Sequence, residues 1–495
     1  MLCQIIPFPQ ELRPRLPVII GNVDDLTLRQ RLEQIDAVLR DGGVEREFVQ
    51  RSLNQWLSGF SCDTTALQQL KFQQRSRRAL RCTILQTLLQ EDFRGFSCQL
   101  AGRPLYQWFC QVDALDQVRV PSKSELQRFA HWLPVEQMRE IIDGLLSGAI
   151  QSPTQLRLKE TLDLEEYFLD STCLKANVHF PTDWVLLRDG VRTLMKPTVL
   201  IRKAGLRGRM EPPEEFLRRM NRLSIEMTQK ARRAGGKKGR KQVLREMKKL
   251  VGIVRSHAQR HRDRLDQKWE RTEWTRPQAE QILKRIDGVL ELLPRAQKQA
   301  HERIIGERQV PNAEKILSHY DSDVRVIVRG KAGAEVEFGN TVLIGENRQG
   351  FILDYEIFRK SAPADSQLLF QSLARVWSVT GRHVGAVVTD RGFASAANSR
   401  RLEESDTVDA TCPRKPAELG QKMKDTKFAR LRRRRAQTEA RIGILKHGFL
   451  GQSMRAKGFA HRELALAWGV LTHNLRMLAR LRKPKKKAVP LAKAA

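Results

Sequence analysis

The strand-like segments of this sequence lie in two places that are separated by a long helical region. The segment EEYFLDSTCL (165–174) is rich in aromatic and β-branched residues, which is typical of a strand. The next strand-like segment begins at residue 323, and from about 211 to 310 the apolar residues recur at helical spacing. One sheet that contains both groups of strands must accommodate this region as an insertion. The sequence therefore predicts a mixed α/β core with a helical insertion at about 190–318.

After the insertion, strands and helices alternate. The predicted elements are strands at 323–330, 334–347 and 349–359, a helix at 364–380, a strand entering a glycine turn at 383–393, a helix at 394–404, a strand at 407–413, and helices at 425–447 and 461–481. Helices that join consecutive strands are typical of a partly parallel sheet.

The charge of the chain points to a polyanionic partner. The chain has 89 Lys and Arg against 56 Asp and Glu, a net charge of +33, and nucleic acid is the commonest polyanion. It has no run of about 18 apolar residues, no secretory signal at its N-terminus and no CxxC pair among its seven cysteines. We therefore expect a cytoplasmic protein associated with nucleic acid. The charge does not distinguish a protein that holds nucleic acid from one that cuts it.

Two regions outside the predicted sheet are candidates for binding nucleic acid. Residues 1–158 read as helical, and within 103–133 a helix, a short break and a second helix capped by Ser122, with Glu125 three residues on, form a helix-turn-helix candidate. An ordinary helical hairpin is the alternative. Residues 230–249 contain ten basic residues and one acid, and their Gly-Gly pair favours a mobile loop. A solvated surface is the alternative to a role in binding. We expect four cations of this stretch to contact phosphates: Lys237, Lys238, Arg240 and Lys241.

Two acids lie in or directly after predicted apolar strands, where a carboxylate is unusual unless it has a specific role. Asp170 lies within the apolar strand YFLDSTC, where Asp is disfavoured. Asp390 follows GAVVT, at the carboxyl end of a strand, where α/β sheets bind ligands, and Arg391 comes next. Cleavage of a phosphodiester by two Mg²⁺ ions needs two or three converging carboxylates. A turn or capping role is the alternative for each acid.

Glu439 is the third candidate acid. It is the only acid among eight basic residues within 427–447, and Arg435 and Lys446 share its helix face. A carboxylate for metal between two cations for phosphate is a coherent arrangement. A charged surface helix in which Glu439 pairs with Arg435 is the alternative. An adjacent apolar stripe is placed to dock this helix on the sheet: Ile442, Leu445 and Phe449.

In this order, the segments YFLDSTCLKANVHFPTD, VVTDRGF and RRAQTEARIGILKHGF resemble the DDE-type transposases of bacterial insertion sequences. The stretch DVRVIVRGKAGAEVEFGNTVLIGEN looks like the segment before the second acid of that family, and the similarity extends from about residue 100 to 480. Arg435, Glu439 and Lys446 match a signature of one branch of the family, whose tyrosine is replaced here by Arg432. Three further residues look familial and have no assigned role: Asn177, His179 and Asp183.

The resemblance implies an RNase H-like fold in which Asp170, Asp390 and Glu439 form the catalytic triad and bind two Mg²⁺ or Mn²⁺ ions. It implies binding of double-stranded DNA at terminal inverted repeats, cleavage, strand transfer and a homo-oligomer on DNA. Residues 1–158 would then be the DNA-binding region, 159–480 the catalytic domain with its insertion, and 481–495 a basic disordered tail. A catalytically inactive DNA-binding relative and a basic metal-dependent nuclease of the same fold are the alternatives.

Overall fold

The computed structural model describes Leu16 and residues 21–59, 64–112, 117–233, 235–331 and 334–483. Within these residues, no helix combines the length and the apolar character that crossing a membrane requires. The predicted tail at 481–495 falls almost entirely outside the described residues.

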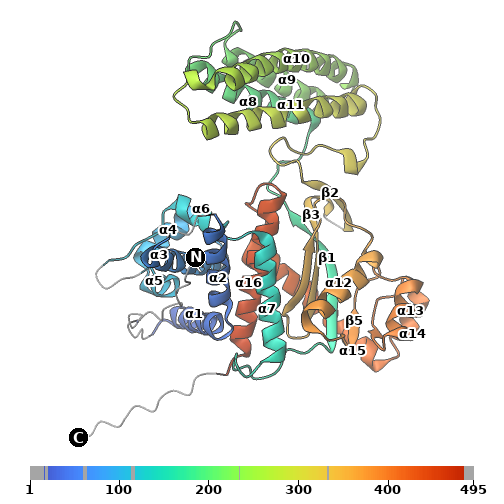
Figure 1. Cartoon of the computed structure of the whole chain (residues 1–495). Coiled ribbons are helices and arrows are strands. Elements are labelled where there is room, and N and C mark those ends of the chain that lie inside the picture. The colour runs from blue at the N-terminus through green and yellow to red at the C-terminus, as the bar shows by residue number, and fades with distance from the viewer. Residues whose placement is uncertain are drawn as a thin grey trace.

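One mixed sheet forms the centre of the described structure (Figure 1). Its six strands are β1 (Glu166–Lys175), β2 (Arg325–Lys331), β3 (Ala334–Asn347), β4 (Ile352–Ile357), β5 (Ala386–Val388) and β6 (Val408–Asp409). The order is β2-β3-β1-β5-β6, and β4 also pairs with β3. β1 runs antiparallel to β3 and parallel to β5, and β5 runs parallel to β6. The predicted partly parallel sheet is confirmed.

Successive residues of β1 face opposite sides of the sheet, as the pleat of a strand requires. Tyr167 donates to or accepts from Ser372 of helix α12 (Asp365–Thr380) at 2.6 Å. Its ring crosses β3 at Gly345, where a Cβ would lie 1.8 Å from the tyrosine oxygen. Phe168 packs on the other side, against α15 (Thr426–Leu445). Asp170 is two residues beyond Phe168 and therefore faces α15 as well.

The N-terminal helices share one hydrophobic core with the sheet. They are α1 (Val23–Asp41), α2 (Val44–Ser58), α3 (Ala66–Leu89), α4 (Phe93–Gly102), α5 (Pro104–Cys110), α6 (Lys123–Phe129) and α7 (Val135–Gln151). α7 and α16 (Phe459–Leu481) lie between the other N-terminal helices and the sheet in Figure 1. The boundary predicted at residue 158 therefore separates two stretches of sequence that fold around a common core.

The helix-turn-helix candidate lies at the edge of this N-terminal body. Ser122 caps α6 as predicted, since its hydroxyl accepts from the backbone N–H of Glu125 at 3.2 Å. α6 packs against α3 and α4. The preceding helix, α5, ends at Cys110, and residues 113–116 of the break lie outside the described residues.

A four-helix bundle stands between β1 and β2 in the chain and apart from the sheet in Figure 1. Its helices are α8 (Asp183–Lys203), α9 (Pro213–Arg232), α10 (Lys237–Lys268) and α11 (Arg276–Ile304). They pack around their own hydrophobic core. Residues 183–308 hold 33 Lys and Arg against 16 Asp and Glu, so a surplus of 17 (33 − 16) resides here. The mobile loop predicted within 230–249 is wrong, because a helix resumes at Lys237.

Two connections tie the bundle to the sheet. On the return segment after α11, His319 and Tyr320 contact the bundle, through the Leu186 carbonyl and the Thr193 hydroxyl. The next residue, Asp321, contacts the sheet side, in a buried ion pair with Arg462 of α16. The return segment therefore changes from bundle contacts to core contacts within two residues.

Beyond β5 the chain completes the wall of the sheet that faces α15. α13 (Ala396–Glu404) joins β5 to β6, and α14 (Pro416–Lys422) follows β6. α15 then continues into a π-helical turn at Lys446–Leu450.

Candidate active site

The register of β1 and β5 brings Asp170 and Asp390 together. Phe168 pairs with Val388 in the parallel ladder. Each acid lies two residues beyond its member of this pair, on the same face and at the carboxyl end of β5, so the two carboxylates are neighbours. This agrees with the position expected for ligand-binding groups in an α/β sheet.

Burial dominates the environment of Asp170. Its side chain is 17% exposed, and loss of water raises its pKa to about 6. Arg435 opposes this rise in pKa, whereas Asp390 and Glu439 add to it. Asp170 accepts a hydrogen bond from the Ser171 backbone N–H at 2.9 Å. The site thus holds a carboxylate that a nearby positive charge is needed to keep ionised.

Asp390 opens a tight turn at the end of β5. Its carboxylate accepts from the Gly392 backbone N–H at 2.8 Å, which fixes its orientation toward the cavity. A Cβ at position 392 would lie 3.0 Å from Asp390 and 2.8 Å from Asp365, so glycine permits both carboxylates to approach.

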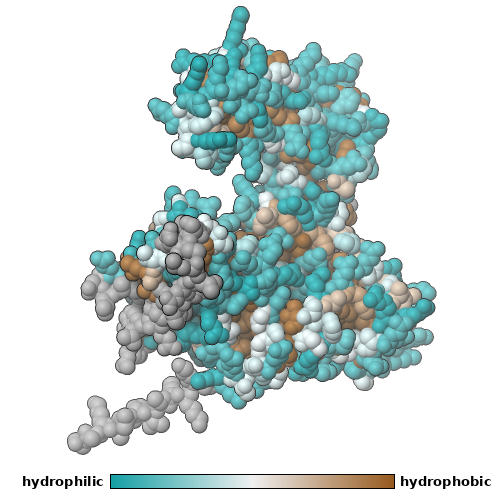
Figure 2. Space-filling view, viewed as in Figure 1, coloured by the Kyte–Doolittle hydropathy of each residue, from teal (hydrophilic) through white to brown (hydrophobic). Residues whose placement is uncertain are grey.

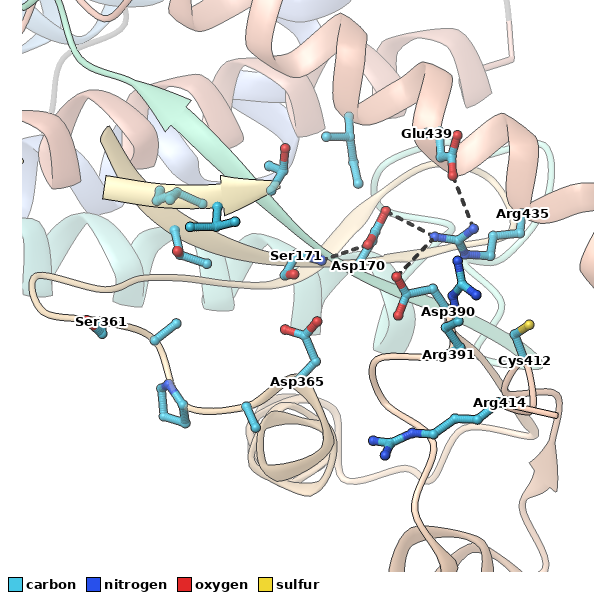
Figure 3. Close-up of a pocket in the computed structure, with 18 of the residues that line it drawn as sticks. Asp170, Ser171, Ser361, Asp365, Asp390, Arg391, Cys412, Arg414, Arg435 and Glu439 are labelled. Carbon is cyan, nitrogen blue, oxygen red and sulfur yellow. Dashed lines mark hydrogen bonds and ion pairs between the residues drawn. The ribbon is translucent and has the colours of Figure 1, made fainter. Parts of the chain in front are cut away.

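The guanidinium of Arg435 lies among all three predicted acids (Figure 3). Its nitrogens are 3.4 Å from Asp170, 4.0 Å from Asp390 and 3.1 Å from Glu439. The helical ion pair between Glu439 and Arg435, expected as the alternative, is therefore present. It does not exclude a shared site, because the same guanidinium also reaches the two strand acids. The three acids converge on one cation.

Buried acids on the strands hold α15 in this position. Glu166 of β1 pairs with Arg430 and Arg434, and Glu346 of β3 pairs with Arg441. Burial raises the pKa of Glu346 to about 7, against the effect of Arg441. Three of the eight basic residues within 427–447 therefore fix the helix to the sheet. The predicted apolar stripe is buried with them: Ile442, Leu445 and Phe449.

The triad lines an open cavity of about 1050 Å³ whose rim is basic. Lys446 lines it and donates to the Thr172 hydroxyl at 3.2 Å, and Arg391 lies beside Asp390. Further basic residues, which sequence reasoning missed, line the same cavity: Arg325, Lys360, Arg414, Arg432 and His447. Arg432 and His447 lie on α15 and the turn that continues it, whereas the other three come from separate segments that no local motif unites.

Asp365 is a fourth acid of this cavity that sequence reasoning also missed. Figure 3 shows its carboxylate directed toward the space below Asp170 and Asp390. It is the first residue of α12, where an Asp reads as an ordinary helix-start residue that favours the helix dipole. The sequence holds no signal that distinguishes an Asp that only starts a helix from one that also lines the cavity.

The donor set suits a hard cation. Carboxylate oxygens are the ligands that Mg²⁺ and Mn²⁺ prefer, and here three carboxylates already surround a positive group. With the side chains as they stand, no three His, Cys, Asp or Glu residues of the described ranges come close enough together to hold a metal ion. A metal ion held by these acids therefore requires their carboxylates to come closer together than they are around Arg435.

The other predicted residues lie elsewhere. Lys237, Lys238, Arg240 and Lys241 belong to the first turns of α10 and do not line this cavity. Asp183 has a structural role, because it is 5% exposed and accepts hydrogen bonds from Arg303 and Gln299 of α11. Asn177 and His179 lie in the connection from β1 to the bundle and line a small cavity of about 170 Å³.

Comparison with known families agrees with this geometry. Residues 330–475 match the family model described as "Transposase DDE domain", which confirms the predicted resemblance to DDE-type transposases over this span. The match includes Asp390 and Glu439 but begins after Asp170. The assignment of Asp170 to the site is therefore based on its sequence motif and on its position beside the other two acids. Searches of curated proteins and of solved structures gave no match.

Proposed function

We propose, on the premise that residues 330–475 form a transposase DDE domain, that this chain is the transposase of an insertion sequence. It would bind the terminal inverted repeats, cleave DNA there and join the freed 3′-OH to target DNA. The observation that carries the proposal is the convergence of Asp170, Asp390 and Glu439 on the Arg435 guanidinium in one basic cavity. The mixed sheet with Asp170 on an inner strand supports an RNase H-like core.

The roles of the residues follow from where they lie. Asp170, Asp390 and Glu439 would hold two Mg²⁺ or Mn²⁺ ions, which when bound activate the attacking oxygen and stabilise the leaving one. Lys446 and Arg391 line the same cavity and would hold the phosphates beside the cleaved bond. Arg435 would exchange its carboxylate partners for a DNA phosphate, because a guanidinium binds either anion in the same bidentate way.

DNA outside the cavity would be held by two other regions. The helix-turn-helix candidate within 103–133 would recognise the inverted repeats, as part of an N-terminal DNA-binding region over 1–158. The basic start of α10 would contact phosphates without reading sequence. By analogy with the family, we expect the active assembly to be a homo-oligomer on DNA.

The experiment that tests this function uses Asp390→Asn and Glu439→Gln in strand-transfer assays with transposon ends and Mg²⁺. Each substitution removes a carboxylate that holds a catalytic ion, and several kcal/mol of transition-state stabilisation corresponds to a loss of at least about 100-fold. DNA affinity should stay close to that of the wild type. Glu404→Gln, an exposed acid on α13, is the control and should retain activity.

Other outcomes of the same assay separate the alternatives. Wild-type rates from Asp390→Asn or Glu439→Gln would contradict the triad. A wild-type protein that cleaves ends without ever producing joined products would be a nuclease of the same fold. One that binds DNA and does neither in Mg²⁺ or Mn²⁺ would be an inactive relative.

A further inference from the structure

A basic cleft lies at the end of the bundle where the chain enters and leaves it. It has a volume of about 840 Å³ and lies between the start of α10, the end of α11 and the return segment that follows. Asp183, the first residue of α8, is bound to Arg303 beside it. Figure 2 shows that the visible surface of the bundle is mostly hydrophilic.

Five cations and one acid line this cleft. The cations are Lys237, Arg240, Arg303, Arg308 and Lys315, and the acid is Glu307. They come from two helices and the return segment, so the cleft is a product of the fold and not of one basic run. A concave surface with this excess of positive charge attracts a polyanion.

Glu307 occupies the cleft as an internal anion. Its carboxylate lies 2.9 Å from the Lys241 ammonium and 3.5 Å from the Lys237 ammonium, and these two lysines lower its pKa. Its backbone has a φ of 53°, in the left-handed region that a residue with a side chain rarely adopts. One carboxylate thus pairs with two ammonium groups, of which Lys237 stays 72% exposed and Lys241 30% exposed.

Arg240 has no such partner among the described residues. Its Nε is buried without a hydrogen-bond acceptor, and its side chain lines the cleft. Arg308 also lines the cleft, is 69% exposed and pairs with Glu302 near the end of α11. The cleft therefore has cations available to a further anion in addition to those that hold Glu307.

We propose that this cleft binds the phosphate backbone of a DNA segment that lies outside the active site, and that Glu307 competes with the DNA phosphate for Lys237 and Lys241. The identity of the polyanion rests on the proposed function. Because one wall of the cleft is the return segment, DNA bound here contacts both the bundle and the connection that leads from it to the sheet.

The test measures binding of a duplex of arbitrary sequence to the full chain at several salt concentrations. Removing two phosphate contacts with Arg240→Gln plus Arg308→Gln should make the slope of log K against log salt less steep by about 1–2, because each contact releases close to one counterion. The control is Lys284→Gln plus Arg285→Gln, which removes the same charge from exposed positions of α11 and should change the slope little.

Glu307→Gln should change DNA affinity in the opposite direction. Loss of the competing carboxylate should raise DNA affinity several-fold, whereas Glu291→Gln, which removes an exposed acid of α11, should raise it far less. A gain of affinity is not an outcome that misfolding produces. Equal slopes for the two double variants, or equal gains for the two acid variants, would overturn the proposal.

The binding test of the cleft can be separated from the strand-transfer test of the proposed function. The measurements are repeated with Asp390→Asn, which leaves the cleft intact. If Asp390→Asn abolishes strand transfer while the cleft variants behave like their controls, the proposed function stands and the cleft proposal is wrong. If the cleft variants change binding as expected and the chain neither cuts nor joins DNA, the cleft proposal stands and the transposase proposal is wrong.

Discussion

Asp170 destabilises the folded protein at neutral pH, and its position in the site explains why it is kept. Burial raises its pKa to about 6, from an ordinary value of 3.8. The folded chain therefore holds a proton that the unfolded chain releases between these two values. Stability from this group is full below about pH 4 and is lost as the pH rises through about 6. Above that range the fold carries a buried negative charge that Arg435 and the hydrogen bond from the Ser171 backbone N–H offset only in part.

Asp170→Asn should therefore stabilise the protein without added metal. At pH 7.5 in the presence of a chelator we expect a gain of about 1–3 kcal/mol in the free energy of unfolding, since one pKa unit corresponds to about 1.4 kcal/mol. The gain should shrink toward zero as the pH falls to about 4. Urea unfolding across this pH range measures it, with Glu404→Gln as the control. A difference between Asp170→Asn and wild type that does not vary with pH would contradict the cause.

At the scale of elements, α15 combines docking to the sheet with presentation of the site. Arg441 and Arg434 point to buried acids of the sheet, while Arg435 and Lys446 point into the cavity. The two sets alternate along one helix, so its register on the sheet sets the position of Glu439. A change that loosens the docking contacts should therefore affect catalysis without touching the triad.

Arg441→Gln tests this coupling. It leaves Glu346, which is 2% exposed, without its main positive partner, and we expect a loss of about 1–3 kcal/mol in stability, together with a fall in strand-transfer rate. The double variant Arg441→Gln plus Glu346→Gln should recover part of the stability, because no buried charge remains. Arg433→Gln, on the exposed side of the same helix, is the matched control. No recovery in the double variant would contradict a charge-based docking.

The limits of sequence reasoning also lie at this scale. Strands and helices with clear periodicity were found. Asp170, Asp390 and Glu439, which the structure brings together, stood out in the sequence because each departs from the pattern of its own element. Glu166 and Glu346 were not found, since an acid in a strand resembles a solvent-facing residue until a helix covers it. The Gly-Gly pair before Lys237 indicated a loop within 230–249, whereas α9 continues to Arg232 and α10 begins at Lys237. Side chains that meet from distant segments leave no local signature.

At the scale of the whole molecule, the bundle has the properties of a separate folding unit. Among the described residues its core includes none of the sheet, and its first and last helices are joined by Asp183 and Arg303. It holds about half of the net charge in about a quarter of the chain. The sheet and the N-terminal helices instead share one core, so we expect them to unfold together.

A fragment of residues 177–322 should therefore fold without the rest of the chain. We expect a largely helical circular dichroism spectrum and a cooperative thermal transition, because all four helices and their core are present. A shorter fragment of residues 177–271 lacks α11, which supplies Ile286, Val289 and Leu293 to that core, and should not unfold cooperatively. A disordered 177–322 fragment would show that the bundle depends on the sheet.

The ladder between β1 and β3 has a consequence for the order in which the chain acquires its structure during synthesis. β1 leaves the ribosome long before its antiparallel partner, since Lys175 pairs with Gly339. Closing so long a loop directly is slow and leaves a hydrophobic strand unpaired. The bundle is translated in the interval, and its folding draws the two ends of that loop together through Asp183 and Arg303. The folded insertion therefore keeps β1, with Asp170, close to the place where β3 will pair with it.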